Sequence, residues 1–164
     1  MVHWSKPGPI QWLDLWLQLT LATIAGSGSG PGPARGVLLA RDKGDRIGAT
    51  TLWAPDPQVA QRDLERLAAL REHWRASCWP VPPRTGWRWW EQERRGQSGL
   101  GAAQKEWEGG HQQRGERQGP DMVACFGGQL PVTALLEPPF PTLSQELFEP
   151  IQAAFEAHPR QGPG

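Results

Sequence analysis

Hydrophobic residues recur at helical spacing most clearly over residues 57–78. Asp56 can accept hydrogen bonds as an N-cap, and Pro57 suits the first turn of a helix. Pro80 follows the segment and cannot continue a helix. The apolar positions share one face, which Arg71 interrupts; they are Ala60, Leu64, Leu67, Trp74 and Cys78. This pattern predicts an amphipathic helix over 57–78 that faces either a small core or a partner.

Apolar residues also dominate residues 10–25, where two periods fit. The leucines alternate as in a strand with one buried face, but Leu13, Leu17 and Leu21 also form one helical stripe. Leucine favours helix, and Pro9 can begin one. The pattern therefore predicts an apolar N-terminal helix over 10–25.

The same N-terminal segment resembles a weak signal peptide. Thr23 and Ala25 are placed like the small residues of a cleavage site before Gly26. Asp14 and Gln18 within the segment argue against this interpretation. A membrane span needs about 20 mostly apolar residues, whereas residues 10–25 number only sixteen and include the charged Asp14. A span is therefore not expected, and membrane association is expected less than a location in water.

The C-terminal part of the chain predicts another helix, over residues 143–157. Thr142 and Gln145 have capping-box spacing. The apolar residues of one face follow them and are Leu143, Leu147, Ile151 and Phe155. Pro150 falls inside the segment and predicts a kink or two short helices.

The remaining segments give weaker signals. Residues 26–36 have the composition of a Gly/Ser/Pro linker, and 37–54 could form a hairpin, with strands within 37–53. Residues 80–121, rich in Pro, Trp and Arg and then in Gly and Gln, are expected to be disordered. Two short apolar runs, 122–126 and 132–136, are interpreted as short strands around Gly127 and Gly128.

Composition strengthens the expectation of disorder. Among 164 residues there are 20 glycines and 17 prolines, which with serine and glutamine exceed the roughly 25–30% typical of low-complexity chains. Ten tryptophans stand beside no tyrosine and no asparagine, a compositional bias that G/C-rich codons explain better than selection for a packed fold. We therefore predict a mostly disordered, irregular, tryptophan-rich chain with isolated α-helices at 10–25, 57–78 and 143–157, and no compact domain.

The sequence contains no recognisable catalytic, cofactor-binding or metal-binding motif. The four histidines are far apart, and none has metal-ligand spacing. Cys78 and Cys125 form no framework and are interpreted as unrelated thiols. The formal charge of zero gives no reason to expect a nucleic-acid partner. We predict a protein that is not an enzyme and uses no cofactor or metal.

A protein partner could bind the two amphipathic helices or the Pro80–Arg84 segment, which partly matches an SH3-domain ligand. The candidate partner-binding residues are Leu64, Leu67, Trp74, Pro80, Pro83, Arg84, Leu147, Ile151 and Phe155.

Three functional hypotheses follow. The codon bias favours an orphan-type open-reading-frame product with no defined biochemical activity. The alternatives are a small helix-mediated protein-interaction protein and a secreted or membrane-associated peptide precursor that begins near Gly26. A cytoplasmic location is expected, with secretion as the alternative if residues 1–25 are a signal peptide.

Overall fold

The computed structural model of the chain describes residues 2–3, 7–26, 34–41, 47–110 and 113–156. They belong to two compact units. Unit 1 comprises residues 1–71 and 149–164, and unit 2 comprises residues 72–148. Helix α7, Phe140–Glu156, contributes its first part to unit 2 and its last part to unit 1. Each unit has its own buried apolar side chains.

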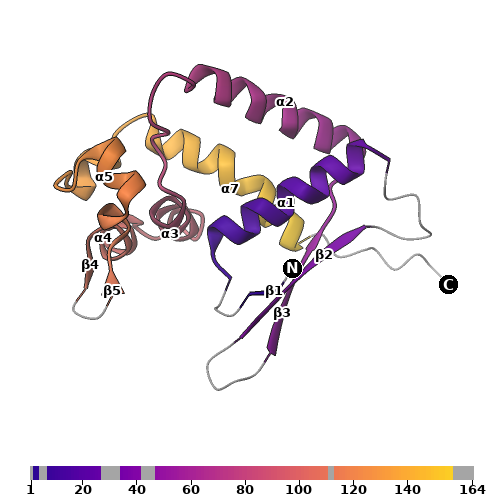
Figure 1. The fold of residues 1–164 in the computed structure, drawn as a ribbon, viewed down its shortest axis with the longest axis horizontal. Helices are drawn as coiled ribbons and strands as arrows, with labels where there is room; N and C mark the ends of the chain where they lie inside the picture. Colours follow the sequence, from indigo (N-terminus) through magenta and orange to yellow (C-terminus); the bar gives the residue numbers. More distant parts are fainter. Residues whose placement is uncertain (1, 4–6, 27–33, 42–46, 111–112, 157–164) are drawn as a thin grey trace. The chain divides into compact units, whose positions relative to one another are not determined.

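Unit 1 contains a small sheet in the order β1–β2–β3. Strands β2, Arg35–Arg41, and β3, Ile47–Trp53, pair antiparallel over their whole length, as Figure 1 shows. Strand β1, Val2–His3, adds a short parallel pairing to β2. The hairpin expected over 37–53 is thus present, although β2 begins inside the segment interpreted as a linker.

Burial alternates along β2, because only one face of the hairpin is covered. Leu38 is fully buried, whereas its neighbours Val37 and Leu39 are exposed. On β3, Leu52 is also fully buried. This alternation is the pattern of an antiparallel sheet with one face packed and the other in water.

Helix α1, Pro9–Ile24, covers this sheet. The helix buries Leu15, Trp16 and Leu19, whose spacing places them on one face. At Gly36 an added Cβ would lie 2.6 Å from Leu15 Cδ1, so the glycine leaves room for the Leu15 side chain against the strand. The helical rather than the alternating period of the leucines therefore determines the local structure.

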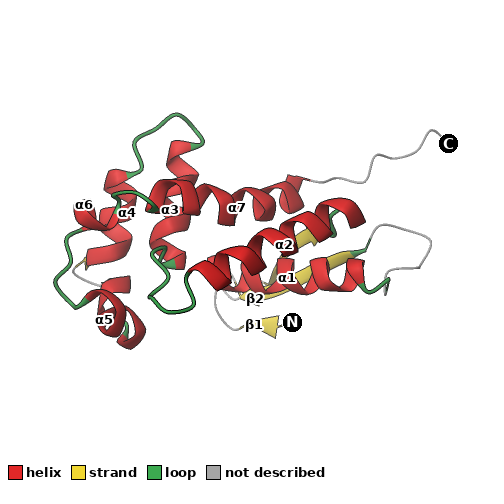
Figure 2. Ribbon diagram, turned by 90° about the horizontal axis from the view of Figure 1, so that it is seen from above, coloured by secondary structure: helices red, strands yellow, loops and turns green. Residues whose placement is uncertain are grey.

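Helix α2, Pro57–His73, lies beside α1 in both ribbon views (Figures 1 and 2). Asp56 caps its first turn, since Oδ1 accepts a hydrogen bond from the Gln58 N–H at 2.9 Å. The helix ends at residue 73 rather than at 78 as expected. Beyond it the chain turns, and the Trp74 and Trp79 rings meet edge to face with centroids 6.2 Å apart.

Unit 2 consists of short helices with little sheet. Its elements are α3 (Pro83–Glu93), α4 (Leu100–Glu108), β4 (Gly109–Gly110), β5 (Gln113–Arg114), the 3₁₀ helix η1 (Glu116–Gln118), α5 (Pro120–Phe126), α6 (Val132–Leu135) and the first part of α7. The strands β4 and β5 pair antiparallel with each other.

An aromatic cluster forms one part of the core of unit 2. Trp87 and Trp90, three residues apart on α3, both pack against the fully buried Phe148 with ring centroids 5.4 Å and 6.1 Å away. Gly86 permits this packing, because an added Cβ would lie 2.5 Å from Val81 Cγ1 and 3.0 Å from Phe148 Cε2. Each such indole can remove about 150–250 Å² from water, so few aliphatic residues are needed.

Trp107 on α4 forms a second buried contact. Its ring meets Phe126 edge to face with centroids 5.7 Å apart. The Trp107 side chain is fully buried, and its Nε1–H donates a hydrogen bond to the Leu130 carbonyl at 2.8 Å. Burial of a tryptophan is stabilising here because its only polar group has a partner.

A buried carboxylate holds the start of α3. Glu116 Oε1 accepts a hydrogen bond from the Arg84 N–H at 3.0 Å. Its Oε2 accepts one from the Thr85 N–H and another from the Thr85 hydroxyl, both at 2.7 Å. Prolines 82 and 83 precede these donors and supply no capping side chain, so Glu116 performs that role from η1.

The prediction of a mostly disordered, low-complexity chain without a compact domain is wrong. Residues 83–93 and 100–108, expected to be disordered, form α3 and α4 and contribute to the aromatic core. The composition criterion behind the prediction counts glycine, proline, serine and glutamine, and it takes no account of tryptophan. In this chain tryptophan supplies much of the buried apolar area of unit 2.

Two further interpretations need correction. Residues 122–126 and 132–135 lie in helices α5 and α6, not in strands. Pro120 falls in the first turn of α5, and Pro131 is the N-cap of α6, positions that proline tolerates. Helix α7 begins at Phe140, three residues earlier than expected, and continues through Pro150 as one helix.

Candidate functional site

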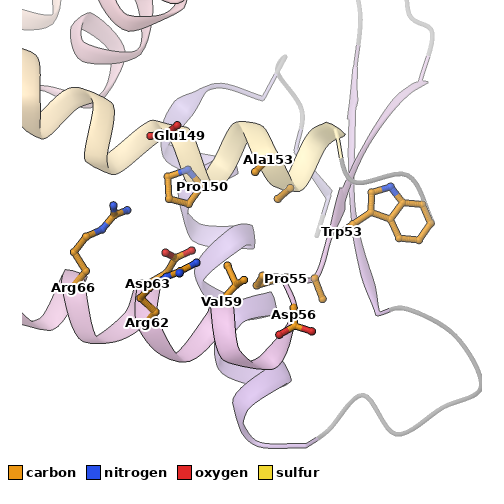
Figure 3. A pocket seen from close by; sticks show the side chains of 12 residues that line it. Trp53, Pro55, Asp56, Val59, Arg62, Asp63, Arg66, Glu149, Pro150 and Ala153 are labelled. Atoms are coloured by element: carbon orange, nitrogen blue, oxygen red, sulfur yellow. The ribbon is translucent and has the colours of Figure 1, made fainter. Parts of the chain in front are cut away.

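A cavity of about 410 Å³ lies within unit 1, between the end of β3, α2 and the last part of α7 (Figure 3). We call it the α2–α7 pocket. Its lining residues are Trp53, Ala54, Pro55, Asp56, Val59, Arg62, Asp63, Arg66, Glu149, Pro150, Ala153 and Ala154.

Helical spacing brings the lining side chains together. On α2, Val59, Arg62 or Asp63, and Arg66 follow each other at intervals of three or four residues and therefore share one face. On α7, Pro150 and Ala153 are likewise three residues apart. The short side chains of α7 leave space in front of the longer ones of α2.

The two ends of the pocket differ in chemistry. Figure 3 shows Arg62, Asp63 and Arg66 on α2 at one end, with Glu149 across from them on α7. Trp53 and Pro55 lie toward the other end, where the wall is apolar apart from Asp56. A ligand in this pocket would meet hydrophobic surface and ionisable groups together, as in many small-ligand sites.

Asp63 is the buried ionisable group of the pocket. Only 8% of the residue is exposed. Burial raises the pKa of its carboxyl above 3.8, and the positive charges of Arg66 and Arg62 only partly oppose this effect. A carboxylate whose ionised form is destabilised in a cavity is a common feature of binding and catalytic sites.

The charges that line the pocket do not balance. Asp56, Asp63 and Glu149 carry three carboxylates, against the two guanidinium groups of Arg62 and Arg66. Asp56 is engaged in capping α2, and Glu149 is exposed. The single excess negative charge of the lining thus comes from Asp56, while the carboxylates of Asp63 and Glu149 equal in number the guanidinium groups at their end of the pocket.

The predicted partner-binding residues lie in several places. Leu64 and Leu67 are half-buried on α2 but do not line the α2–α7 pocket. Leu147 and Ile151 are buried in the described structure. Phe155 is half-buried, and its ring meets Trp12 edge to face at 5.5 Å. Their binding role stays a prediction.

The other candidates belong to unit 2. Trp74 and Pro80 are half-buried. Pro83 begins α3, and Arg84 forms an ion pair with Glu106, with its Nε 2.6 Å from Oε1. The Pro80–Arg84 segment therefore runs into a helix instead of extending as a polyproline II ligand would.

The charged residues of the pocket are not recognisable as a site from the sequence alone. The burial of Asp63 is nevertheless indicated by its position, because it lies three residues after Ala60 and four before Leu67, on the apolar face of α2. An acidic residue at such a position is expected to be buried. The contribution of α7 could not be seen, since it comes from a segment more than eighty residues away.

The described residues hold neither a metal-binding cluster nor a membrane-spanning helix. They contain no group of three or more His, Cys, Asp or Glu side chains that could hold a metal ion. Within the same part of the chain, every helix is too short or too polar to cross a membrane. His111 and His158 lie outside the described residues.

Comparison with known proteins gives no relative from which to assign the pocket. No protein-family model matches the chain, and no curated protein is significantly similar to it.

Proposed function

We propose that the protein is a non-enzymatic interaction protein, and that its α2–α7 pocket binds a lysine or arginine side chain of a partner. The observation that carries this proposal is the cavity of about 410 Å³, whose wall combines apolar side chains with the buried Asp63 carboxylate. The two helices that form the pocket are also the two that the sequence marks as amphipathic.

The apolar wall suits the stem of a basic side chain. Lysine and arginine carry methylene groups that pack on apolar surface while the charged head remains near polar groups. Val59, Pro150 and Ala153 provide such a surface between the two ends of the pocket. The volume lies within the roughly 300–1,000 Å³ of typical ligand pockets and has room for a neighbouring residue too.

The carboxylates suit the head group. Burial destabilises the ionised form of Asp63, and an entering cation would compensate for that loss of solvation. Glu149 on the opposite helix adds a second negative charge. Binding of a cation should therefore lower the pKa of Asp63, and the affinity for the cation should increase as the pH rises through the pKa that Asp63 has in the free protein.

The position of α1 argues against the secreted-precursor hypothesis. Cleavage before Gly26 would remove a helix whose Leu15, Trp16 and Leu19 are buried in unit 1. Under our proposal this segment is a permanent part of the fold and the protein is cytoplasmic. Recovery of protein from cells with residues 1–25 missing would contradict this part of the proposal.

Binding can be tested by calorimetry with the full chain and capped hexapeptides. The peptides differ at one position only, which holds lysine, norleucine or glutamate. We expect the lysine peptide to bind at least fivefold more tightly than the norleucine peptide, and the glutamate peptide to bind most weakly. Asp63→Asn should remove the preference for lysine, whereas the matched control Asp121→Asn, on an exposed residue of α5, should leave it unchanged.

Two results would overturn the proposal. One is a folded protein that binds none of the three peptides at millimolar concentration, which would favour a product with no defined biochemical activity. The other is a preference for lysine that Asp63→Asn leaves intact, which would place the binding site elsewhere.

A further inference from the structure

The only two cysteines of the chain are brought together in unit 2. Cys78 lies in the connection between α2 and α3, and Cys125 lies on α5. That connection runs beside α5 in both ribbon views (Figures 1 and 2). Both residues are exposed and in the free thiol form, and the Cys125 thiol is hydrogen-bonded to Cys78. Their interpretation as unrelated thiols is therefore wrong.

We propose that Cys78 and Cys125 form a reversible intramolecular disulfide by exchange with a small oxidised disulfide such as glutathione disulfide. Two thiols within hydrogen-bonding distance need little backbone movement to reach the geometry of a bridge. Exposure of both residues gives the oxidant access.

The exchange proceeds in two balanced steps. The Cys78 thiolate attacks one sulfur of glutathione disulfide, which forms a mixed disulfide and releases one glutathione thiolate. The Cys125 thiolate then attacks the Cys78 sulfur and displaces the second glutathione. Two electrons pass from the protein thiols to glutathione disulfide, and the two thiol protons are taken up as two glutathione thiols form.

The order of these steps follows from the surroundings of Cys125. The hydrogen bond with Cys78 raises the pKa of the Cys125 thiol, and the negative charge of Asp121 contributes to the same effect. A raised thiol pKa reduces the thiolate fraction near neutral pH. Cys125 is accordingly disfavoured as the initial nucleophile, so the proposal assigns it the step that resolves the mixed disulfide on Cys78.

The bridge would enclose most of unit 2. The chain between the two cysteines contains α3, α4 and η1, and hence Trp87, Trp90 and the Glu116 cap. A cross-link around this segment restricts the unfolded chain more than the folded one. Oxidation should therefore raise the denaturant concentration at the unfolding midpoint of unit 2, and reduction of the bridge should lower the midpoint to its original value.

The proposal can be tested by incubating the full chain with reduced and oxidised glutathione at several ratios. Trapping with iodoacetamide and peptide mapping by mass spectrometry then identify the products. We expect a Cys78–Cys125 cross-linked peptide from monomeric protein, formed at least tenfold faster in native buffer than in concentrated urea. The variant Cys125→Ser should stop at a mixed disulfide on Cys78.

Three outcomes would overturn the proposal. In the first, both thiols remain free in excess glutathione disulfide. In the second, the bridge forms equally fast in urea, so that the fold contributes nothing to the pairing. In the third, oxidation produces only dimers linked between chains. The variant Cys78→Ser serves as a control, because its folding can be checked by circular dichroism independently of disulfide formation.

Discussion

Replacement of Glu116 should destabilise unit 2 more than any other change of an acidic residue there. Glu116 is buried and accepts three hydrogen bonds from the first turn of α3, at 3.0, 2.7 and 2.7 Å. A hydrogen bond to a charged group contributes about 1.5–3 kcal/mol, and loss of a helix cap costs about 0.5–2 kcal/mol. Because these contributions overlap, we expect Glu116→Ala to reduce the free energy of unfolding by about 3–5 kcal/mol.

Glu116→Gln separates the geometry of the cap from its charge. The amide has one carbonyl oxygen, which can replace Oε2 and accept both bonds from Thr85. Its NH₂ group would then face the Arg84 N–H, which loses its acceptor. We expect this variant to lose about 1–2 kcal/mol, clearly less than Glu116→Ala.

Urea unfolding followed by tryptophan fluorescence and by far-ultraviolet circular dichroism measures both variants. The fluorescence is weighted toward unit 2, which contains the tryptophans at positions 74, 79, 87, 89, 90 and 107. The exposed Glu137 provides matched controls in Glu137→Ala and Glu137→Gln, which should change stability by less than about 0.5 kcal/mol. If Glu116→Ala were as mild as Glu137→Ala, the interpretation of Glu116 as a long-range cap would be refuted.

Three further predictions concern other residues. Asp63→Asn should stabilise the protein at neutral pH, because the raised pKa of Asp63 means that its ionisation destabilises the fold. The difference in stability from wild type should fall to zero as the pH drops below 3.8, and a pH-independent difference in urea midpoints would contradict this. Gly86→Ala should lower the free energy of unfolding by about 1–3 kcal/mol, since the added Cβ would lie 2.5 Å from Val81 Cγ1. Gly101→Ala in α4, where an added Cβ meets no atom within 4 Å, should be neutral or stabilising, and equal effects of the two changes on the melting temperature would be the contrary result. Trp107→Phe should lower the free energy of unfolding in urea by about 2–4 kcal/mol, because it leaves a smaller ring and removes the donor to the Leu130 carbonyl. A decrease below about 0.5 kcal/mol would contradict the buried placement of Trp107.

The parts of the fold that the sequence predicts are those governed by local signals. Asp56 and Pro57 mark the beginning of α2, and the capping hydrogen bond to Gln58 confirms the role of Asp56. Leucine-rich residues 10–25 correspond to α1 within one residue at each end. In these segments the residues that determine the structure lie within one or two turns of each other.

The fold of unit 2 is not predicted from the sequence, because the contacts that determine it are aromatic and join residues far apart in the chain. Trp87 and Trp90 have helical spacing, but they lie after a proline-rich stretch, within residues 80–121, whose composition predicts disorder. Their burial depends on Phe148, about sixty residues away. The cap of α3 likewise comes from Glu116 and not from an adjacent residue. Codon bias can therefore explain where the tryptophans came from without preventing them from forming a core.

The candidate pocket could be predicted only in part. The position of Asp63 on the apolar seam of α2 indicates that it is buried, but the pairing of α2 with α7 depends on the folded chain. Cys78 and Cys125 are a similar case, since nothing in their separation along the chain indicates that the thiols meet.

In our proposal the α2–α7 pocket uses the buried Asp63 to bind a basic side chain. Carbon-13 NMR titration of the Asp63 carboxyl, with and without saturating lysine hexapeptide, tests it directly. We predict a pKa above 3.8 in the free protein that falls when the peptide is bound. A pKa of Asp63 that is the same in the free and peptide-saturated protein would contradict the proposal.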